Sequence, residues 1–259
     1  MITAIIWNIR FVKSQHAFQR LINLKRQYNS FIVALMEPFQ HSKHLQKYRR
    51  RIGMETALTN INGKIWVFID AVVQWEILLD TNQQISLKLK HIATDIEMIA
   101  TFVYAKCSAV ERLELWDNIY SLANDMSLPW LVGGDFNVIL SEEEKIGGLP
   151  VDPSECDDFA FCVNSSELFD MGFKGSPYTW WNRRAAGDCI LKILDRILVN
   201  IRFQNSFPNI EVEHLTKTGS DHSPMVLFCG EEAIPISKPF RFLNFWTQHE
   251  SFQEVIKNN

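Results

Sequence analysis

The sequence contains few cysteines, no long hydrophobic run and no excess of basic residues. Its five cysteines are scattered and include no Cys-x-x-Cys pair, so neither a disulfide framework nor a zinc site is indicated. We expect reduced thiols in an intracellular protein. The longest apolar runs, such as residues 31–36 and 65–69, are far shorter than the roughly 18–20 residues of a membrane-spanning helix. We therefore predict no membrane partner.

The charge balance and the composition are those of an ordinary globular protein. Lys and Arg number 26 and Asp and Glu number 30, which leaves a formal net charge of −4 and argues against a protein that coats nucleic acid with a basic surface. Any contact with nucleic acid must therefore be local. Apolar residues make up 47% of the 259 positions, which is enough for one sizeable core.

Short apolar runs alternate with segments of helical periodicity. Strands are predicted at residues 2–7, 31–36, 75–79, 85–89, 97–104, 130–132, 178–182, 193–199 and 225–229. Helices are predicted at residues 17–28, 41–51 and 109–126, with another after Ser154. The Asn62-Gly63 dipeptide favours a hairpin turn in the middle third of the chain. Together these patterns predict an α/β sandwich with mainly antiparallel or mixed sheets.

Polar side chains stand at the ends of several predicted strands, where a sheet places its loops and its sites. They are Asn8, Glu37, Tyr104, Asp135, Asn137, Asp221 and His222. Taken singly, an Asn or Asp at such a place is more often a turn or capping residue than a functional one. Their recurrence at strand ends makes the set a candidate site.

Asp195 differs from these residues because it lies inside an apolar run. A carboxylate there is costly unless it is hydrogen-bonded or paired with a charge. A buried histidine would serve as its partner. Ion pairing with Arg196 or Lys192 is the structural alternative, although adjacent strand residues point to opposite faces of a sheet.

Five motifs carry these residues in a characteristic order. They are Trp7-Asn8, Leu35-Met36-Glu37-Pro38, Gly134-Asp135-Phe136-Asn137, Leu194-Asp195-Arg196 and Ser220-Asp221-His222-Ser223-Pro224. Their order and approximate spacing resemble those of the endonuclease/exonuclease/phosphatase superfamily, which includes the abasic-site endonucleases and pancreatic deoxyribonuclease. Residues 35–40, 178–182 and 238–246 further resemble the endonuclease domain of plant non-LTR (LINE-type) retrotransposon polyproteins.

The resemblance implies a fold and a division of the chain. We expect residues 1–230 to form a four-layer α/β sandwich with two central mixed, mainly antiparallel sheets. Residues 231–259 resemble the start of a linker to a reverse transcriptase, a domain that this sequence does not contain. The chain is thus expected to be either a fragment of an element or a stand-alone derivative.

The resemblance also implies a metal site. Glu37 is expected to be the main ligand, with Asn8 and Asp221 near the same ion. These hard oxygen ligands suit Mg²⁺, which keeps several waters and needs only one or two protein carboxylates; Mn²⁺ is an alternative. The expected reaction is hydrolysis of a phosphodiester in DNA that leaves a 3′-hydroxyl and a 5′-phosphate.

Roles for the remaining residues follow from the same resemblance. Asp135 is expected to orient or deprotonate the attacking water, Asn137 to hold that water or a phosphate oxygen, and Tyr104 to reach the phosphate. His222, steadied by Asp195, is expected to bind or protonate a phosphoryl oxygen. Whether Asp135 or His222 acts as the base is open.

Contacts with DNA are predicted from one basic run and one aromatic pair. The basic run consists of Lys43, Lys47, Arg49, Arg50 and Arg51, which could follow a phosphate backbone or form a solvated helix face. Trp180 and Trp181 alternate in a strand, so one indole is expected to face the core and the other to face outward, where it could stack on a base. A genomic DNA substrate would imply the nucleus.

The sequence departs from the family pattern at two positions. Phe11 stands where a glycine usually follows Asn-x-Arg, and Ile193 stands where a basic residue commonly precedes Leu-Asp. Both departures bear on catalytic activity rather than on the fold. Two alternatives therefore stay open: a degenerate, non-catalytic nucleic-acid-binding remnant, and a phosphatase or RNA nuclease of the same superfamily.

Overall fold

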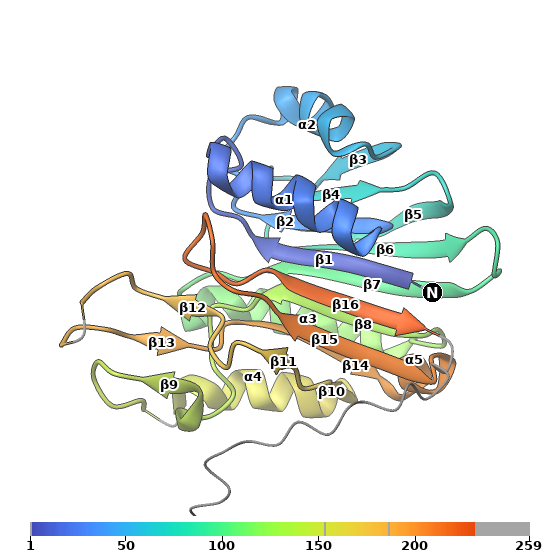
Figure 1. Cartoon of the computed structure of the whole chain (residues 1–259). Helices are drawn as coiled ribbons and strands as arrows, with labels where there is room; N and C mark the ends of the chain where they lie inside the picture. Colours follow the sequence, from blue (N-terminus) through green and yellow to red (C-terminus); the bar gives the residue numbers. More distant parts are fainter. Residues whose placement is uncertain (1, 153, 186, 231–259) are drawn as a thin grey trace, which may run out of the picture.

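The computed structural model describes residues 2–152, 154–185 and 187–230 and contains two large sheets and one small one (Figure 1). The first sheet has the strand order β11 (Lys174–Gly175), β15 (Asn209–His214), β16 (Met225–Gly230), β1 (Ile2–Asn8), β2 (Ile32–Met36), β4 (Ile65–Ile69) and β3 (Thr56–Thr59). The second has the order β10 (Leu168–Asp170), β14 (Asp195–Asn200), β8 (Trp130–Asp135), β7 (Glu97–Tyr104), β6 (Gln84–His91) and β5 (Val73–Asp80). The small sheet joins β12 (Trp180–Trp181), β13 (Leu191–Lys192) and β9 (Lys145–Ile146).

Each large sheet has a parallel pair near its centre, and the other neighbours of that pair are antiparallel. In the first sheet β1 and β2 are parallel, and in the second β7 and β8 are parallel. Parallel neighbours need a crossover connection. Helix α1 (Gln15–Tyr28) supplies it between β1 and β2, and α3 (Ala109–Asn124) supplies it between β7 and β8. The carboxyl ends of these four strands therefore carry loops that meet at one edge of the molecule.

Alternation along the strands explains why the two sheets stack. Ala4 and Ile6 of β1 belong to the inner core cluster, whereas Ile5 and Trp7 belong to the cluster beneath the helices. All four side chains are buried because both faces of this sheet are covered. The inner cluster draws on strands of both large sheets and forms the main core between them.

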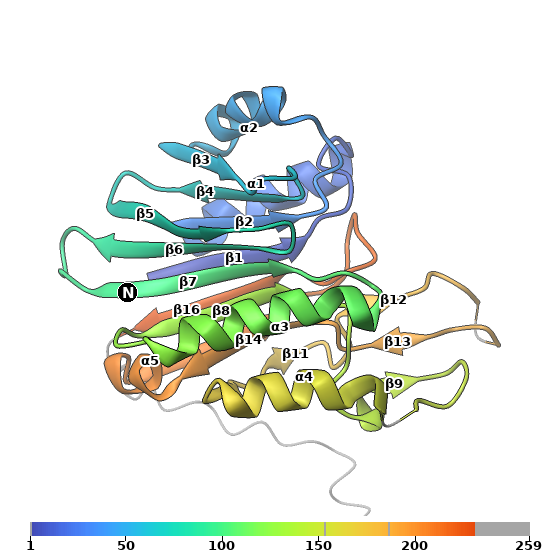
Figure 2. The ribbon, with the colours of Figure 1, turned by 180° about the vertical axis from the view of Figure 1, so that it is seen from behind.

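Helices form the two outer layers. Helix α1 and α2 (Leu45–Ile52) pack on the first sheet, and α3 and α4 (Ser154–Ser165) pack on the second (Figures 1 and 2). A short helix α5 (Ile201–Ser206) and two 3-10 turns, η1 (Ser42–His44) and η2 (Glu142–Glu144), complete the elements. This arrangement confirms the predicted four-layer α/β sandwich with two mixed, mainly antiparallel sheets.

Several element boundaries differ from the sequence prediction. The strand expected at 193–199 begins at Asp195 and ends at Asn200, and the strand expected at 178–182 is limited to Trp180–Trp181. Strand β15 and helix α5 were not predicted. Strand β15 reads Asn-Ile-Glu-Val-Glu-His, with Ile210 and Val212 on one face and charged residues between, because it lies near the edge of its sheet.

Two features bear on partners and domain boundaries. Within the part of the chain that the structure describes, no helix is both long and apolar enough to cross a membrane. The predicted tail, residues 231–259, lies outside the described residues. The division of the chain at residue 230 stays a prediction.

Candidate active site

The register of the second sheet places three of the predicted residues in one row. Tyr104 ends β7, Asp135 ends β8 and Asp195 begins β14, and Asp135 is the direct register partner of both others. In the first sheet, Asn8 ends β1 and Glu37 directly follows β2. The site is therefore built from strand ends of both large sheets, as the position of these residues in the sequence predicts.

Hydrogen bonds join the two sheets at this edge. The Asn8 Nδ2 donates to Asp135 Oδ2 at 2.8 Å and lies 3.4 Å from Glu37 Oε2. The Tyr104 hydroxyl donates to Glu37 Oε1. Glu37 has a φ of +49°, an uncommon conformation for a non-glycine residue, and its N–H donates to the Lys64 carbonyl oxygen at 3.0 Å. These contacts hold the Glu37 carboxylate at the seam between the sheets.

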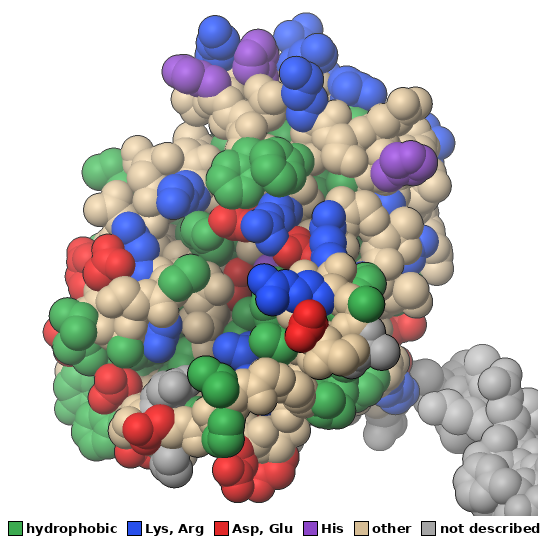
Figure 3. Space-filling view, turned by 90° about the vertical axis from the view of Figure 1, so that its left-hand side faces the viewer, with side chains coloured by type: hydrophobic (Ala, Val, Ile, Leu, Met, Phe, Trp, Pro, Cys, Tyr) green, Lys and Arg blue, Asp and Glu red, His purple; other side chains and the backbone are tan. Residues whose placement is uncertain are grey.

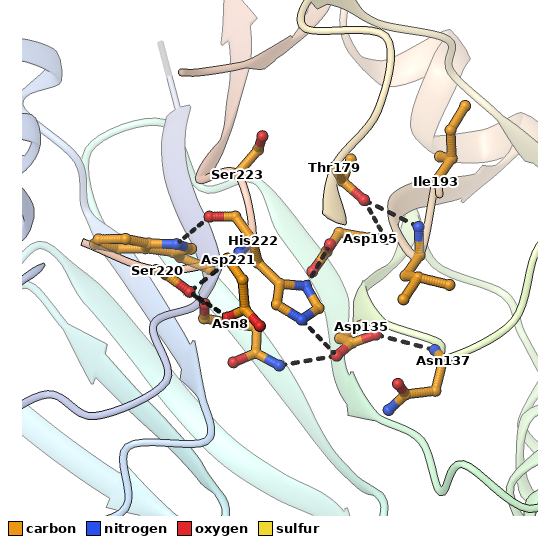
Figure 4. A network of polar contacts seen from close by, with 12 residues as sticks. Asn8, Asp135, Asn137, Thr179, Ile193, Asp195, Ser220, Asp221, His222 and Ser223 are labelled. Atoms are coloured by element: carbon orange, nitrogen blue, oxygen red, sulfur yellow. Dashed lines mark hydrogen bonds and ion pairs between the residues drawn. The ribbon is translucent and has the colours of Figure 1, made fainter. Parts of the chain in front are cut away.

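The loop before β16 brings Asp221 and His222 to the same seam (Figure 4). The Trp7 indole N–H donates to the His222 carbonyl oxygen at 3.1 Å, and the Ser220 hydroxyl donates to the Asn8 carbonyl oxygen at 2.8 Å. The His222 N–H in turn donates to Ser220 Oγ at 3.1 Å. The loop is thus anchored on the end of β1, so that the His222 ring faces the second sheet.

His222 stands between the two buried carboxylates of the second sheet (Figure 4). Its Nδ1 lies 2.8 Å from Asp195 Oδ2, and its Nε2 lies 3.8 Å from Asp135 Oδ2. All three side chains are almost fully buried. The hydroxyl of buried Thr179 accepts the Asp195 N–H at 3.0 Å and thereby fixes the backbone of Asp195. The histidine partner expected for Asp195 is present.

The Arg196 ion-pair alternative for Asp195 is not realised. Arg196 points to the other face of β14, where its guanidinium lies 2.5 Å from Glu144 Oε2 and 2.6 Å from Asp170 Oδ2. Alternation of side chains along a strand explains this separation, because neighbours such as Asp195 and Arg196 face opposite sides. The Asp195 carboxylate therefore pairs with the His222 imidazole instead.

Burial and neighbouring charges together raise the pKa values of Asp135, His222 and Tyr104. Burial raises the pKa of Asp135 to about 7, although the His222 charge and the Asn8 amide act against the rise. Burial alone would lower the pKa of His222, but the Asp195 and Asp135 carboxylates outweigh it and raise that pKa to about 9. Burial and the Glu37 carboxylate also raise the pKa of Tyr104, which therefore remains a hydroxyl donor. A protonated His222 is thus favoured beside the carboxylates at neutral pH.

Asn137 is oriented by the loop that follows β8. Its N–H donates to Asp135 Oδ1 at 3.0 Å, and its Nδ2 donates to the Ala105 carbonyl oxygen at 2.7 Å. The residue has a φ of +51°, so the turn brings its partly buried side chain back toward the site. The structure thus brings Asn137 close to Asp135, as expected (Figure 4).

The predicted metal ligands form a group of oxygen atoms that suits a hard divalent cation. Asn8 Oδ1 is buried and has no hydrogen-bond partner among the described residues, which is costly unless another group binds it. Glu37 lies beside the same amide, and the Arg10 guanidinium connects Asp221 and Glu37, with Nε 4.0 Å from Glu37 Oε2. One unpartnered amide oxygen and two carboxylates are the kind of donor set that Mg²⁺ binds. The residues present therefore fit the implied ion.

A different group in the described chain also meets the spacing of a metal site. Ligand atoms of Asp135, Asp195 and His222 lie within 4.8 Å of one another. The His222 Nδ1 is already engaged by Asp195, however, and Asp135 accepts from Asn8. Nitrogen and carboxylate ligands in such a cluster suit transition metals better than Mg²⁺. We interpret this cluster as a proton-handling group beside the oxygen-rich site.

The predicted DNA-contacting residues lie in two places. The basic run lies on η1 and α2, where Arg49 donates to the Met54 and Glu55 carbonyl oxygens and Arg51 lies 4.3 Å over the Phe18 ring. Arg49 thus stabilises the end of α2 and Arg51 contacts α1, whereas Lys43 and Lys47 are exposed. The set thus combines structural and solvent-facing cations, and its role in DNA binding stays a prediction.

The tryptophan pair divides in the predicted way. Trp180 packs on a small core cluster and pairs through its backbone with His222, whereas Trp181 is exposed. Their strand β12 belongs to the small sheet rather than to either large one. Trp180 is partly buried and contributes to positioning the site, and Trp181 is the more exposed of the two.

The two departures from the family pattern are accommodated without disrupting the site. Phe11 adopts a φ of +75°, a left-handed conformation that favours glycine, and its exposed ring lies against the Phe39 ring in a tilted arrangement with centroids 4.7 Å apart. The Ile193 N–H donates to the Glu144 carbonyl oxygen at 3.1 Å. The first loop retains a glycine-like backbone and presents a phenyl ring instead.

Some residues of the site were not predicted. The Thr179 hydroxyl accepts the Asp195 N–H, and the Ser220 hydroxyl donates to the Asn8 carbonyl oxygen and so anchors the His222 loop. Both residues lie in motifs that carry the family resemblance, but neither was assigned a role from the sequence. Arg10 and Arg183 form ion pairs with Asp221, with Arg183 Nη2 3.7 Å from Asp221 Oδ1. Proximity of Arg10 to Asn8 in the sequence is a weak signal, and nothing in the sequence points to Arg183.

Comparison with known proteins identifies related folds. The endonuclease domain of TRAS1, a telomere-specific non-LTR retrotransposon, superposes with a TM-score of 0.65 at 13% identity and covers 92% of this chain and 100% of its own. An AP endonuclease from Archaeoglobus fulgidus gives 0.63 at 15% identity, covering 88% of this chain and 99% of its own. The 3′ phosphatase NExo from Neisseria, bound to a product DNA hairpin, gives 0.61 at 15% identity, covering 89% and 100%.

Sequence comparison gives the family directly. No curated protein matches the chain. The model of the endonuclease/exonuclease/phosphatase family matches residues 5–222, a span that includes the site described above. The matched region extends from β1 to His222 and includes the strands of both large sheets except β16. The chain belongs to the endonuclease/exonuclease/phosphatase family.

Proposed function

We propose that this chain is a Mg²⁺-dependent endonuclease that nicks DNA and leaves a 3′-hydroxyl. The observation that carries the proposal is the placement of the unpartnered Asn8 Oδ1, with Glu37 and Asp221, beside the Asp195–His222–Asp135 group. Hydrolysis of a phosphodiester needs neutralisation of phosphoryl charge, an oriented water and a proton donor. Each of these three requirements has candidate residues here.

The metal would be held by Asn8, Glu37 and Asp221. Bound there, Mg²⁺ would supply charge neutralisation for the phosphoryl oxygens, and Mn²⁺, which accepts the same oxygen ligands, would serve in its place. Tyr104 donates to Glu37 and so orients that carboxylate. Hydrogen bonding of this kind fixes the direction of a ligand's lone pairs.

The other residues would handle the water and the proton. Asp195 accepts from Nδ1 of His222 and thereby aims Nε2 into the site, where a protonated imidazole can donate to a phosphoryl oxygen. Asp135, with a pKa raised to about 7, is suited to orient or deprotonate the attacking water. Asn137 would hold the water or a phosphate oxygen beside it.

The proposal extends to the origin of the chain and its setting. Similarity to the TRAS1 endonuclease domain supports derivation from a non-LTR retrotransposon, in which the 3′-hydroxyl would prime a reverse transcriptase. A genomic DNA substrate would require action in the nucleus. The phosphatase alternative rests on similarity to the Neisseria 3′ phosphatase, and hydrolysis of a 3′-phosphate oligonucleotide compared with plasmid DNA separates the two.

The proposal is tested by conversion of supercoiled plasmid to open circle in Mg²⁺ and in EDTA. Wild type is compared with His222→Ala and Glu37→Gln. The exposed residues His16 and Glu76 supply matched controls, His16→Ala and Glu76→Gln. We expect nicking that needs the metal, is lost in both site variants and is retained in both controls. Folded wild type that fails to nick with Mg²⁺ or Mn²⁺ would favour the non-catalytic remnant.

A further inference from the structure

Phe11 and Phe39 form an exposed aromatic pair that no core requires. Their ring centroids lie 4.7 Å apart with the ring planes tilted by 31°, and the residues are 55% and 50% exposed. Neither belongs to the hydrophobic clusters beneath the helices or between the sheets. An exposed pair of large apolar rings beside a functional site is typical of a binding surface.

The backbone holds the pair in an unfavourable conformation. Phe11 has a φ of +75° and Phe39 a φ of +43°, a region that bulky L-residues rarely adopt. The Phe11 N–H donates to the Glu37 carbonyl oxygen at 3.1 Å, and the Val12 N–H donates to the Pro38 carbonyl oxygen at 3.0 Å. Since the loops are tied together and to Glu37, the rings have a set position relative to the candidate metal site.

A cationic cleft adjoins the pair. The cleft has a volume of about 1000 Å³, and its lining includes Arg10, Phe11, Lys13, Arg183, Arg184 and Asp221. The loops after β1 and β2 lie at the left end of the molecule in Figure 1, and the same end in Figure 3 shows Lys and Arg side chains around a hollow with a hydrophobic patch at its rim. Four cations in a chain of net charge −4 make this the local attractive field that a polyanion needs.

We propose that Phe11 and Phe39 form a stacking platform for one nucleobase of the DNA strand whose phosphates lie in this cleft. The inference rests on the proposed function only in taking DNA as the polymer. Cations that follow the backbone combined with aromatic rings that stack on bases are the general means of binding single strands without sequence preference. The platform would fix the strand relative to Glu37 and contribute to substrate specificity.

The test measures binding without cleavage. A single-stranded oligonucleotide that carries 2-aminopurine is titrated with protein in EDTA, with anisotropy reporting affinity and fluorescence reporting stacking. Phe11→Gly removes one ring and suits the observed φ, so it keeps the loop intact. Phe39→Leu removes the other π-face and retains apolar volume. Phe161, which is 74% exposed on α4, supplies the matched control Phe161→Ala.

We expect quenching with wild type and with the control, and loss of quenching in both platform variants together with an affinity about tenfold weaker. Unchanged affinity and quenching in the variants, or no binding by wild type at low salt, would overturn the platform. Concentration-dependent association that the variants abolish, without an effect on DNA, would instead identify a contact between copies. Wild type that binds and quenches but never nicks plasmid would refute the proposed function and keep the platform.

Discussion

The buried carboxylate of Asp195 determines both the orientation and the charge of His222. It lies 2.8 Å from Nδ1 and is the main influence that overcomes burial to raise the pKa of His222 to about 9. Buried carboxylates rarely occur without such a partner because an isolated charge in a low-dielectric interior is costly. The pair is thus a unit, and changing one member should change the other.

Replacing Asp195 with asparagine should lower the pKa of His222 and slow the reaction. Asp195→Asn keeps the shape of the side chain but removes the charge that favours the imidazolium. We expect NMR titration in EDTA to show the lower pKa, and plasmid nicking to fall by roughly 10²–10⁴-fold. Asp170→Asn is the control because Asp170 pairs with Arg196 instead. An unaltered His222 titration in Asp195→Asn would contradict this assignment.

His214 should make the fold less stable in mild acid. Burial lowers the pKa of this histidine to about 4, so it is neutral in the folded protein, with its ring stacked on Phe173 at 4.1 Å. In the unfolded chain its pKa is about 6.5. The unfolded state therefore binds more protons between pH 6.5 and 4, so stability decreases as the pH is lowered through that window, by up to on the order of 3 kcal/mol. Urea unfolding of wild type and His214→Gln across this range measures it, and equal slopes would refute the prediction.

At the level of the strands, the Gly133-Gly134-Asp135 end of β8 depends on the absence of a side chain. Gly134 has a φ of +152°, and a Cβ there would lie 2.0 Å from the Val103 carbonyl oxygen of β7. Since β7 and β8 run in parallel and carry Tyr104 and Asp135 at their ends, this contact also sets the spacing of two site residues. The absence of a side chain at Gly134 thus allows β7 and β8 to pair closely and places Tyr104 beside Asp135.

Gly134→Ala should consequently separate β7 from β8. We expect a loss of more than about 3 kcal/mol in the free energy of unfolding, because the clash is with backbone that cannot move aside cheaply. Gly187→Ala is the control, since a Cβ at Gly187 meets nothing within 4 Å. Chemical denaturation compares the two variants. Equal stability of Gly134→Ala and wild type would show that the strands can shift without cost.

Much of this element arrangement could be predicted from the sequence, and the reasons are physical. Buried strands such as β1 and β2 are unbroken apolar runs, and the polar residues that end them stand out by contrast. Asp195 was recognised as needing a histidine because its carboxylate interrupts such a run. The two-residue strands β12 and β13 could not be predicted, since their pairing depends on contacts far apart in the sequence.

Ion pairs between residues far apart in the sequence could not be predicted either. Arg183 reaches Asp221 across 38 positions of the chain, and Arg196 reaches Glu144 across 52. Such partners are selected by the three-dimensional packing, and the sequence carries no periodic signal for them. The basic run on α2 was visible for the opposite reason, because its members are consecutive, although Arg49 and Arg51 turn out to make structural contacts.

At the scale of the whole molecule, the charge is slightly negative while the cleft is locally basic. The net charge of −4 gives no general attraction for DNA, so the proposed binding would rely on the few cations beside the site. Each phosphate contact releases counterions and contributes to the salt dependence of binding. The number of working cations can therefore be counted in solution.

The double variant Arg183→Gln/Arg184→Gln should lower the slope of log affinity against log salt by roughly two, because two phosphate contacts are lost. Anisotropy with duplex DNA over a range of KCl concentrations gives the slope. Lys174→Gln is the control, since the Lys174 ammonium lies 2.5 Å from Glu211, on the strand pair β11 and β15. A slope that falls as much in the control as in the double variant would assign the effect to net charge alone.

The pairing of β1 with β16 has a consequence for the order of events on the ribosome. Asn8 emerges early in synthesis, whereas the strand beside it and the His222 loop emerge more than two hundred residues later. The first sheet can close around β1 only when this last strand arrives, and such non-local pairing is slow. A nascent chain interrupted before Met225 would contain Glu37, Asp135 and His222 and yet lack the strand that pairs with β1, so the candidate site would be assembled only in chains that extend past β16.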